Sequence, residues 1–300
     1  MYLQHLEGWD PCKTKNLKLH IRDQCNTDFC WAIASITCVE YVYQLQRGKH
    51  LRLSVQQVID EILSKDIESG DDGNTYQNVF IHMKSHRVTL AKYYPFIGTR
   101  GVAKMLRRHE KKKSYKIDGF EAIDIKNEKQ VMRILKERGP IVVGMSIDNK
   151  FDDVKEEIYE GTSIPPKLDE ELGDDELCHV LSESEPSEDS AHDSSDSYSS
   201  DLERPDDYED DYFDDKDSSE NGDDETLDEA LEESRDHAMV LLGYGTKIIG
   251  GERVHYWIAQ NSYGYDWGIN GIGRIRRASS IRAPYYDPIL DGAIPILRRL

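Results

Sequence analysis

Four residues of this 300-residue chain are of the types that carry out nucleophilic acyl transfer. Cys30 ends the stretch Gln-Cys-Asn-Thr-Asp-Phe-Cys that begins at Gln24, His237 lies in Asp-His-Ala-Met-Val-Leu-Leu-Gly-Tyr-Gly, and Asn261 opens Asn-Ser-Tyr-Gly-Tyr-Asp-Trp-Gly. A thiolate is a nucleophile, an imidazole can take and return its proton, and carboxamides can orient the imidazole or bind an oxyanion. The set therefore predicts chemistry through an acyl-enzyme.

The nucleophile is expected at the start of a helix. Residues 31–46 carry apolar side chains at helical spacing and contain no Gly or Pro, which predicts a buried helix that begins at Cys30. The partial positive charge of a helix N-terminus favours a thiolate, so we expect the pKa of this thiol to lie below the free value of roughly 8.5.

The general base and its partner are expected on neighbouring strands. His237 leads an apolar run that predicts a strand followed by a turn at Gly243–Gly245, and a hairpin over residues 246–251 would connect it to a second strand ending at Asn261. The Asn261 amide would set the tautomer of His237. Gln24 would join the Cys30 backbone amide in an oxyanion hole.

Taken singly, each of these residues also has a structural interpretation. A lone Cys at a helix start is often an inert core residue, and a lone His in an apolar run is often structural. A rival base, His179, stands before an apolar pair but lacks the Gly-Tyr-Gly that follows His237. The four residues in their shared contexts favour the catalytic interpretation.

Together these stretches resemble the papain-like cysteine peptidases over residues 9–161 and 236–277. The stretch 53–60 is similar to the start of the family's second helix, where Ser54 and Gln57 would form a capping box. The resemblance implies an α+β fold with a helical left domain, a β-rich right domain and an active-site cleft between them. The expected bounds are 1–115 for the left domain, 116–161 with 236–300 for the right domain, and 162–235 for an insertion.

The resemblance also implies residues that contact substrate, namely Asp28, Gly73, Asn74, Asp236 and Tyr263. Asp28 stands where relatives have a small residue that lines the pocket on the acyl side of the scissile bond. Its carboxylate should raise the pKa of the thiol and favour Arg or Lys in that pocket. Alternatively, Asp28 caps the helix.

The cysteines favour a reducing compartment. Thr27, Asp71 and Glu61 stand where family members have disulfide cysteines, and the first ten residues lack the apolar core of a signal peptide. We therefore expect a cytoplasmic or nuclear protein, either without a propeptide or with an incomplete start. No metal or organic cofactor is required, and neither a membrane nor a nucleic acid is expected as a partner.

The segment 169–235 is strongly acidic. It holds 30 Asp and Glu against three Lys and Arg, a net charge of 3 − 30 = −27, so the rest of the −20 chain carries −20 + 27 = +7. Such a Ser-rich block cannot bury enough apolar surface to fold alone, which predicts disorder across the 162–235 insertion. It could bind cationic proteins, cover the basic core, or have no task.

These observations predict a cysteine-type endopeptidase that acts on proteins or peptides. The alternative is a weak or inactive papain-like scaffold whose acidic insertion binds cationic proteins.

Replacing residues 169–235 by a short Gly/Ser linker should leave a soluble core, because the segment lacks apolar side chains to contribute to it. Urea unfolding of the shortened chain should remain cooperative. Loss of the cooperative transition would show that the segment is structural.

Overall fold

The computed structural model describes residues 8–69, 75–165 and 234–298, and for residues 64–69 it describes the backbone only. Most of the acidic segment and the turn at 70–74 lie outside these residues. The expectations for both, including disorder in the insertion, stay predictions.

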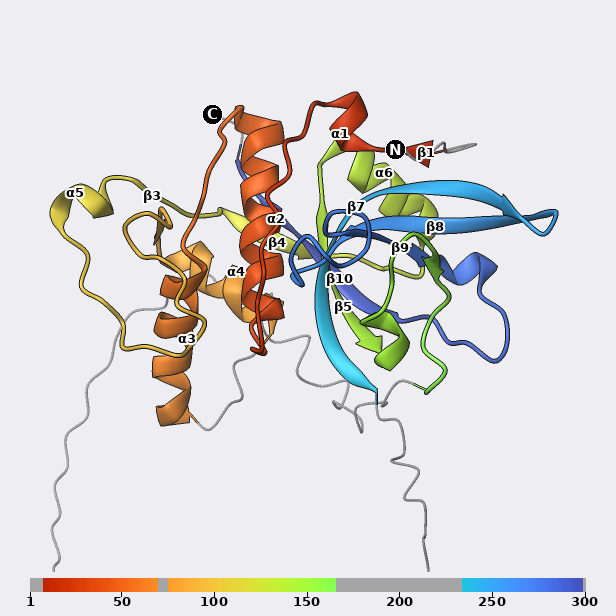
Figure 1. The fold of residues 1–300 in the computed structure, drawn as a ribbon. Coiled ribbons are helices and arrows are strands. Elements are labelled where there is room, and N and C mark those ends of the chain that lie inside the picture. Colours follow the sequence, from red (N-terminus) through yellow and green to blue (C-terminus); the bar gives the residue numbers. More distant parts are fainter. Residues whose placement is uncertain (1–7, 70–74, 166–233, 299–300) are drawn as a thin grey trace, which may run out of the picture. The chain divides into compact units, whose positions relative to one another are not determined.

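Helices predominate in the first half of the described chain, and long strands predominate in its second half (Figure 1). The helices are α1 Pro11–Thr14, α2 Cys30–Arg47, α3 Val55–Ser69, α4 Tyr76–Ser85, α5 Arg108–Lys111 and α6 Glu128–Glu137, with 3-10 turns η1 Asn149–Phe151 and η3 Ala278–Ser280.

The strands form one eight-stranded sheet and one two-stranded sheet in the described residues. The large sheet has the order β4-β10-β5-β7-β8-β9-β6, with β1 added on β7, and only the β6–β9 pair is parallel. Its strands are β1 Gly8–Trp9, β4 Gly119–Ala122, β5 Ile141–Ile147, β6 Ile158–Tyr159, β7 Arg235–Ile249, β8 Glu252–Gln260, β9 Ile272–Arg276 and β10 Ile289–Ile296. The small sheet pairs β2 Val88–Thr89 with β3 Ser114–Tyr115. The expected α+β class is confirmed.

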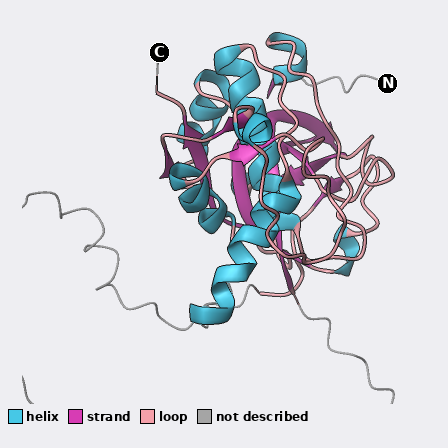
Figure 2. Ribbon diagram, turned by 90° about the vertical axis from the view of Figure 1, so that its left-hand side faces the viewer, coloured by secondary structure: helices cyan, strands magenta, loops and turns pink. Residues whose placement is uncertain are grey.

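The long strand β7 is buried on both faces, which explains its continuous apolar sequence. Ala238, Val240 and Leu242 belong to the core that contains α2, α3 and α4, while Met239 and Leu241 belong to the core that contains α6. Seen from the helical side, the helices lie in front of the strands (Figure 2). Successive side chains of β7 therefore point alternately into the two cores, as they do along any strand.

The predicted helix at Cys30 is confirmed as α2. All residues from Trp31 to Val42 are buried, so α2 is a central helix rather than a surface one. It ends where Gly48 adopts the left-handed conformation (φ 62°) and its N–H bonds the carbonyls of the last turn.

The predicted turn at Gly243–Gly245 is wrong. Strand β7 runs through these residues with a bulge between Leu241 and Gly243, and the hairpin turn is Gly250–Gly251. A Cβ on Gly243 would collide with the backbone carbonyl oxygen of Trp9, because β1 pairs with β7 at this point. The glycine marks the close approach of a distant strand, not a turn.

The predicted capping box at α3 is half correct. The Gln57 N–H donates to Ser54 Oγ (2.9 Å), but the Gln57 side chain accepts from the Thr89 N–H (2.8 Å) instead of reaching back. Its Nε2 also donates to Glu61 Oε1 (2.9 Å), and His82 Nε2 lies 2.9 Å from Glu61 Oε2. At a position where the resemblance places a disulfide cysteine, this chain has a hydrogen-bonded carboxylate.

A buried ion pair holds the segment before the nucleophile against α2. The Arg22 guanidinium makes two bonds to the Glu40 carboxylate (2.6 and 3.0 Å) and one to Thr37 Oγ1 (2.7 Å). Glu40 also accepts the Leu53 N–H (2.5 Å), so it fixes the chain entering α3 as well. Burial raises the pKa of Glu40, and the Arg22 charge opposes that rise.

Removing the Glu40 charge should destabilise the fold strongly, because it leaves a buried guanidinium unpaired. We expect Glu40→Gln to lower the free energy of unfolding by roughly 3 to 5 kcal/mol in urea titration. The matched control is Glu252→Gln, which breaks an exposed ion pair to Arg282 (2.9 Å) and should cost under about 1 kcal/mol. Equal losses in the two variants would contradict the role assigned to the buried pair.

Candidate active site

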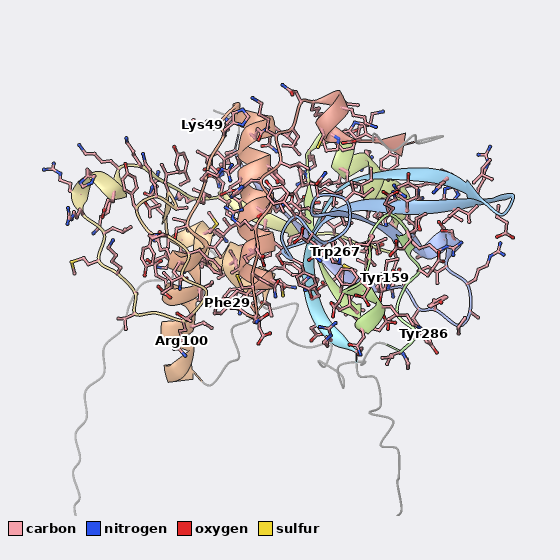
Figure 3. The ribbon with its side chains drawn as sticks, in the orientation of Figure 1. Phe29, Lys49, Arg100, Tyr159, Trp267 and Tyr286 are labelled. Carbon is pink, nitrogen blue, oxygen red and sulfur yellow. The ribbon has the colours of Figure 1, made fainter. Side chains whose placement is uncertain are left out.

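The thiol lies at the first residue of α2, and α2 packs against β7. The preceding residue, Phe29, has φ −92° and ψ 19°, and no side chain caps the helix start. The alternative that Asp28 is the cap is therefore wrong, and Asp28 is exposed. The Phe29 ring, which is labelled in Figure 3, meets the Phe96 ring edge-on with centroids 6.4 Å apart.

The expectation of a lowered thiol pKa is also wrong for this structure. Burial raises the pKa of Cys30, and backbone hydrogen bonds from Ala238, Trp31 and Cys30 itself oppose the rise without cancelling it. The Asp28 charge raises the pKa further, as the sequence predicted. Desolvation outweighs the helix N-terminus in this state, although Cys30 itself is only half-buried. The contact with Ala238 sets the sulfur beside the residue that follows His237.

The imidazole and the carboxamide meet as the sequence predicts. His237 Nε2 lies 2.7 Å from Asn261 Oδ1, and Asn261 is the residue directly after β8. The same Oδ1 accepts the Ser262 N–H (2.7 Å), which identifies it as the oxygen. Because that oxygen can only accept, His237 carries its proton on Nε2 and leaves the Nδ1 lone pair free.

Aromatic rings remove the His237–Asn261 pair from water. The ring centroids of Tyr263 and Phe151 lie 4.9 and 5.6 Å from the imidazole, and Trp267 packs on Phe151 at 5.0 Å. His237 is 5% exposed, and this burial lowers its pKa to about 4, although the bond to Asn261 acts in the opposite direction. Burial therefore disfavours both the thiolate of Cys30 and the imidazolium of His237 in this state. No sequence motif surrounds Phe151, so its contact with His237 is apparent only in the folded chain.

Gln24 is held in place by Ser262, a residue that the sequence analysis did not single out. Ser262 Oγ donates to Gln24 Oε1 (2.5 Å), and the Gln24 N–H donates to the Ser262 carbonyl (2.7 Å). One hydrogen of Gln24 Nε2 is used by the carbonyl of Thr27. The second hydrogen remains for an oxyanion. In the sequence, the one indication that Ser262 belongs to the site is its position directly after Asn261.

The residues expected to contact substrate are only partly described. Asp28 and Asp236 are exposed, Tyr263 is half-buried against His237, and Gly73 and Asn74 lie outside the described residues. Asp28 acts electrostatically on both the thiol and Tyr263, raising the pKa of each after burial has done so more strongly. Across the described ranges, no three His, Cys, Asp or Glu side chains gather as metal ligands.

Comparisons with known proteins bear on the family and the fold of this chain. The profile described as "Papain family cysteine protease" matches residues 7–173 and 223–285. A cysteine proteinase of Brassica napus is 22% identical over 278 residues, covering 92% of this chain and 61% of that protein. Ananain of Ananas comosus is 26% identical over 141 residues, covering 47% of this chain and 39% of ananain. The chain thus spans between 39% and 61% of these two relatives.

Solved structures share the fold. The bromelain protease of Ananas comosus, in complex with an inhibitor, matches with a TM-score of 0.62 at 20% identity, covering 97% of this chain and 99% of that one. A recombinant stem bromelain precursor matches with a TM-score of 0.61 at 19% identity, covering 98% of this chain and 72% of that one. Because the profile spans both the thiol-bearing and the imidazole-bearing segments, this chain belongs to the papain family of cysteine proteases.

Proposed function

We propose that this chain hydrolyses peptide bonds through an acyl-enzyme on Cys30. The observation that carries the proposal is the 2.7 Å bond between His237 Nε2 and Asn261 Oδ1, because it leaves Nδ1 as the basic nitrogen. Family membership supports a protease of the cysteine type. The substrates would be proteins or peptides.

Acylation would begin from the neutral pair. As the carbonyl carbon of the substrate approaches, the thiol proton moves to His237 Nδ1 and the Cys30 Sγ–C bond forms. The carbonyl π pair becomes an oxyanion, which the Cys30 N–H and the second hydrogen of Gln24 Nε2 can bind. Each charge forms only together with its counter-charge, which avoids an isolated ion in a buried site.

The remaining steps would reuse the same groups. Collapse of the oxyanion breaks the C–N bond, and the Nδ1 proton of His237 goes to the leaving amine. A water molecule then attacks the thioester, its proton passes to Nδ1, and the sulfur of Cys30 leaves and regains a proton. The products are a carboxylic acid and an amine.

Labelling by an epoxide-type thiol reagent tests this proposal directly. We expect one labelled site, lost in Cys30→Ala, and labelling in His237→Ala that is slower by about a hundredfold or more, because general acid–base assistance is removed. Cys25→Ala is the matched control, since Cys25 is an exposed free thiol nearby in sequence. An unreactive Cys30, together with salt-sensitive binding of cationic proteins by the intact chain, would support the scaffold alternative instead.

The acid limb of kcat/KM should fall near pH 4. Burial lowers the pKa of His237 to about 4, so the base remains available as the pH falls and is lost only when Nδ1 is protonated. Pre-steady-state or steady-state hydrolysis of an uncharged peptide substrate would measure the limb. A limb near the ordinary value of about 6.5 would show that the imidazole is hydrated in the working enzyme.

Asp28 should favour Arg or Lys on the acyl side of the scissile bond. Its carboxylate is exposed, caps no helix and is close enough to affect the pKa of Cys30. A charge-assisted contact to a basic side chain would give a preference of about tenfold or more. We expect Asp28→Gly to abolish the preference when peptides with Arg, Ala or Glu at that position are compared. Identical preferences in the two proteins would remove Asp28 from substrate recognition.

A further inference from the structure

Two apolar side chains stand almost fully in water on the loop between β2 and α5. Val102 is 92% exposed and Met105 is 89% exposed, while Ile97 at the start of the loop is 60% exposed. Other large exposed apolar side chains of the described residues reach at most 64%, at Tyr265. Neighbouring apolar side chains that are exposed to this degree call for a partner.

The backbone of this loop is anchored, so the exposed side chains have a defined place. Asp60 is 2% exposed and accepts both the Gly101 N–H (2.8 Å) and the Tyr94 hydroxyl (2.7 Å). The Tyr94 oxygen in turn accepts the Lys104 N–H (2.9 Å). Gln56 Nε2 donates to the Thr99 carbonyl (2.7 Å). Buried polar groups thus hold residues 99–104 and turn Val102 outward.

The same stretch is strongly basic. Residues 100–116 contain eight Lys and Arg and one acid, a net charge of 8 − 1 = +7. That acid, Glu110, is buried and accepts the Arg107 N–H (2.6 Å). None of the eight cations pairs with a carboxylate of the described residues. Helix α5 lies at the outer edge in Figure 1, and Figure 3 labels Arg100 at the foot of α3.

We propose that residues 97–113 form a docking surface for an anionic phospholipid membrane. Cations attract the anionic headgroups, and the aliphatic side chains of Val102 and Met105 enter the interface between them. Duplex nucleic acids bind basic surfaces through their phosphates, and single strands also stack on aromatic rings. Neither a nucleic acid nor an acidic peptide needs an inserted aliphatic side chain, so the exposed pair Val102 and Met105 favours the bilayer.

Peripheral docking is compatible with the rest of the chain. No helix of residues 8–69, 75–165 and 234–298 is long and apolar enough to span a bilayer, so the contact would be superficial. The net charge of −20 of the whole chain acts weakly beyond a Debye length of about 8 Å at physiological salt. Residues 97–113 hold seven Lys and Arg and one Glu, and this local net charge of 7 − 1 = +6 would lie in contact with the headgroups. The proposal departs from the expectation of no membrane partner, which rested on the lack of a spanning segment.

Vesicle co-sedimentation of the full chain tests the apolar part of the proposal. We expect binding to vesicles of phosphatidylcholine with phosphatidylserine, and little binding to phosphatidylcholine alone. Val102→Ser with Met105→Ser should weaken binding about tenfold or more. The matched control is Ile248→Ser with Ile249→Ser at the tip of the β7–β8 hairpin, where the two side chains are 53% and 44% exposed. That control should bind as the unmodified chain does.

A second pair of variants tests the contribution of the positive charges to vesicle binding. Removing three cations of the docking surface should weaken vesicle binding roughly a hundredfold, since each Lys contributes about fivefold near an anionic surface. Removing three exposed cations in and beside α6 should change it little. The two triple variants are Lys111→Gln, Lys112→Gln, Lys113→Gln and Lys126→Gln, Lys129→Gln, Lys136→Gln.

Several results would overturn the proposal. A failure of the full chain to bind phosphatidylserine vesicles would contradict it. An equal loss of vesicle binding in a variant and its control, or unchanged binding after the Val102 and Met105 substitutions, would contradict it as well. Tighter binding of duplex DNA or of poly-L-glutamate than of vesicles, with no contribution from Val102 and Met105, would identify a nucleic acid or an acidic polypeptide as the partner instead. The urea unfolding midpoints of all variants should equal that of the unmodified chain, which would exclude unfolding as the cause of weaker vesicle binding.

Discussion

The buried ion pair of Arg22 and Glu40 is the constraint on which the site depends. Glu40 projects from the middle of α2, while Arg22 lies just before the segment that carries Gln24. Because a buried charge is costly when unpaired, the two side chains hold this segment on the helix that begins with Cys30. The Arg22 carbonyl also accepts the Gly264 N–H (3.1 Å), which ties the same segment to the loop after β8.

The loop after β8 carries Ser262, which orients the side-chain amides of both Asn261 and Gln24. Ser262 gives its backbone N–H to Asn261 Oδ1 and its hydroxyl to Gln24 Oε1. The tautomer of His237 and the direction of the Gln24 donor therefore depend on the same short stretch of chain. A displacement of this loop would disturb the proposed general base and the proposed oxyanion donor together, because both amides are held by the same loop.

Local signals in the sequence predicted the elements that carry the site but not the contacts between distant segments. The apolar spacing after Cys30 and the strand before Asn261 correspond to α2 and β8, since each pattern arises within its own element. Gly243 was misread because its cause is the carbonyl of Trp9, more than two hundred residues away in the sequence. Phe151 could not be found for the same reason, since only the fold brings it to His237.

Burial and the helix N-terminus act on the pKa of Cys30 in opposite directions. A helix N-terminus is visible in a sequence, whereas the burial that opposes it is a property of the assembled fold. Burial acts on both partners in the same sense, since it disfavours the thiolate of Cys30 and the imidazolium of His237 alike. The proposed acylation therefore moves the thiol proton to His237 as the substrate carbonyl approaches, so that the two charges form together. Burial that disfavours both ions is thus compatible with the proposed reaction, because the charges would be created together and the proposed oxyanion donors are already in place.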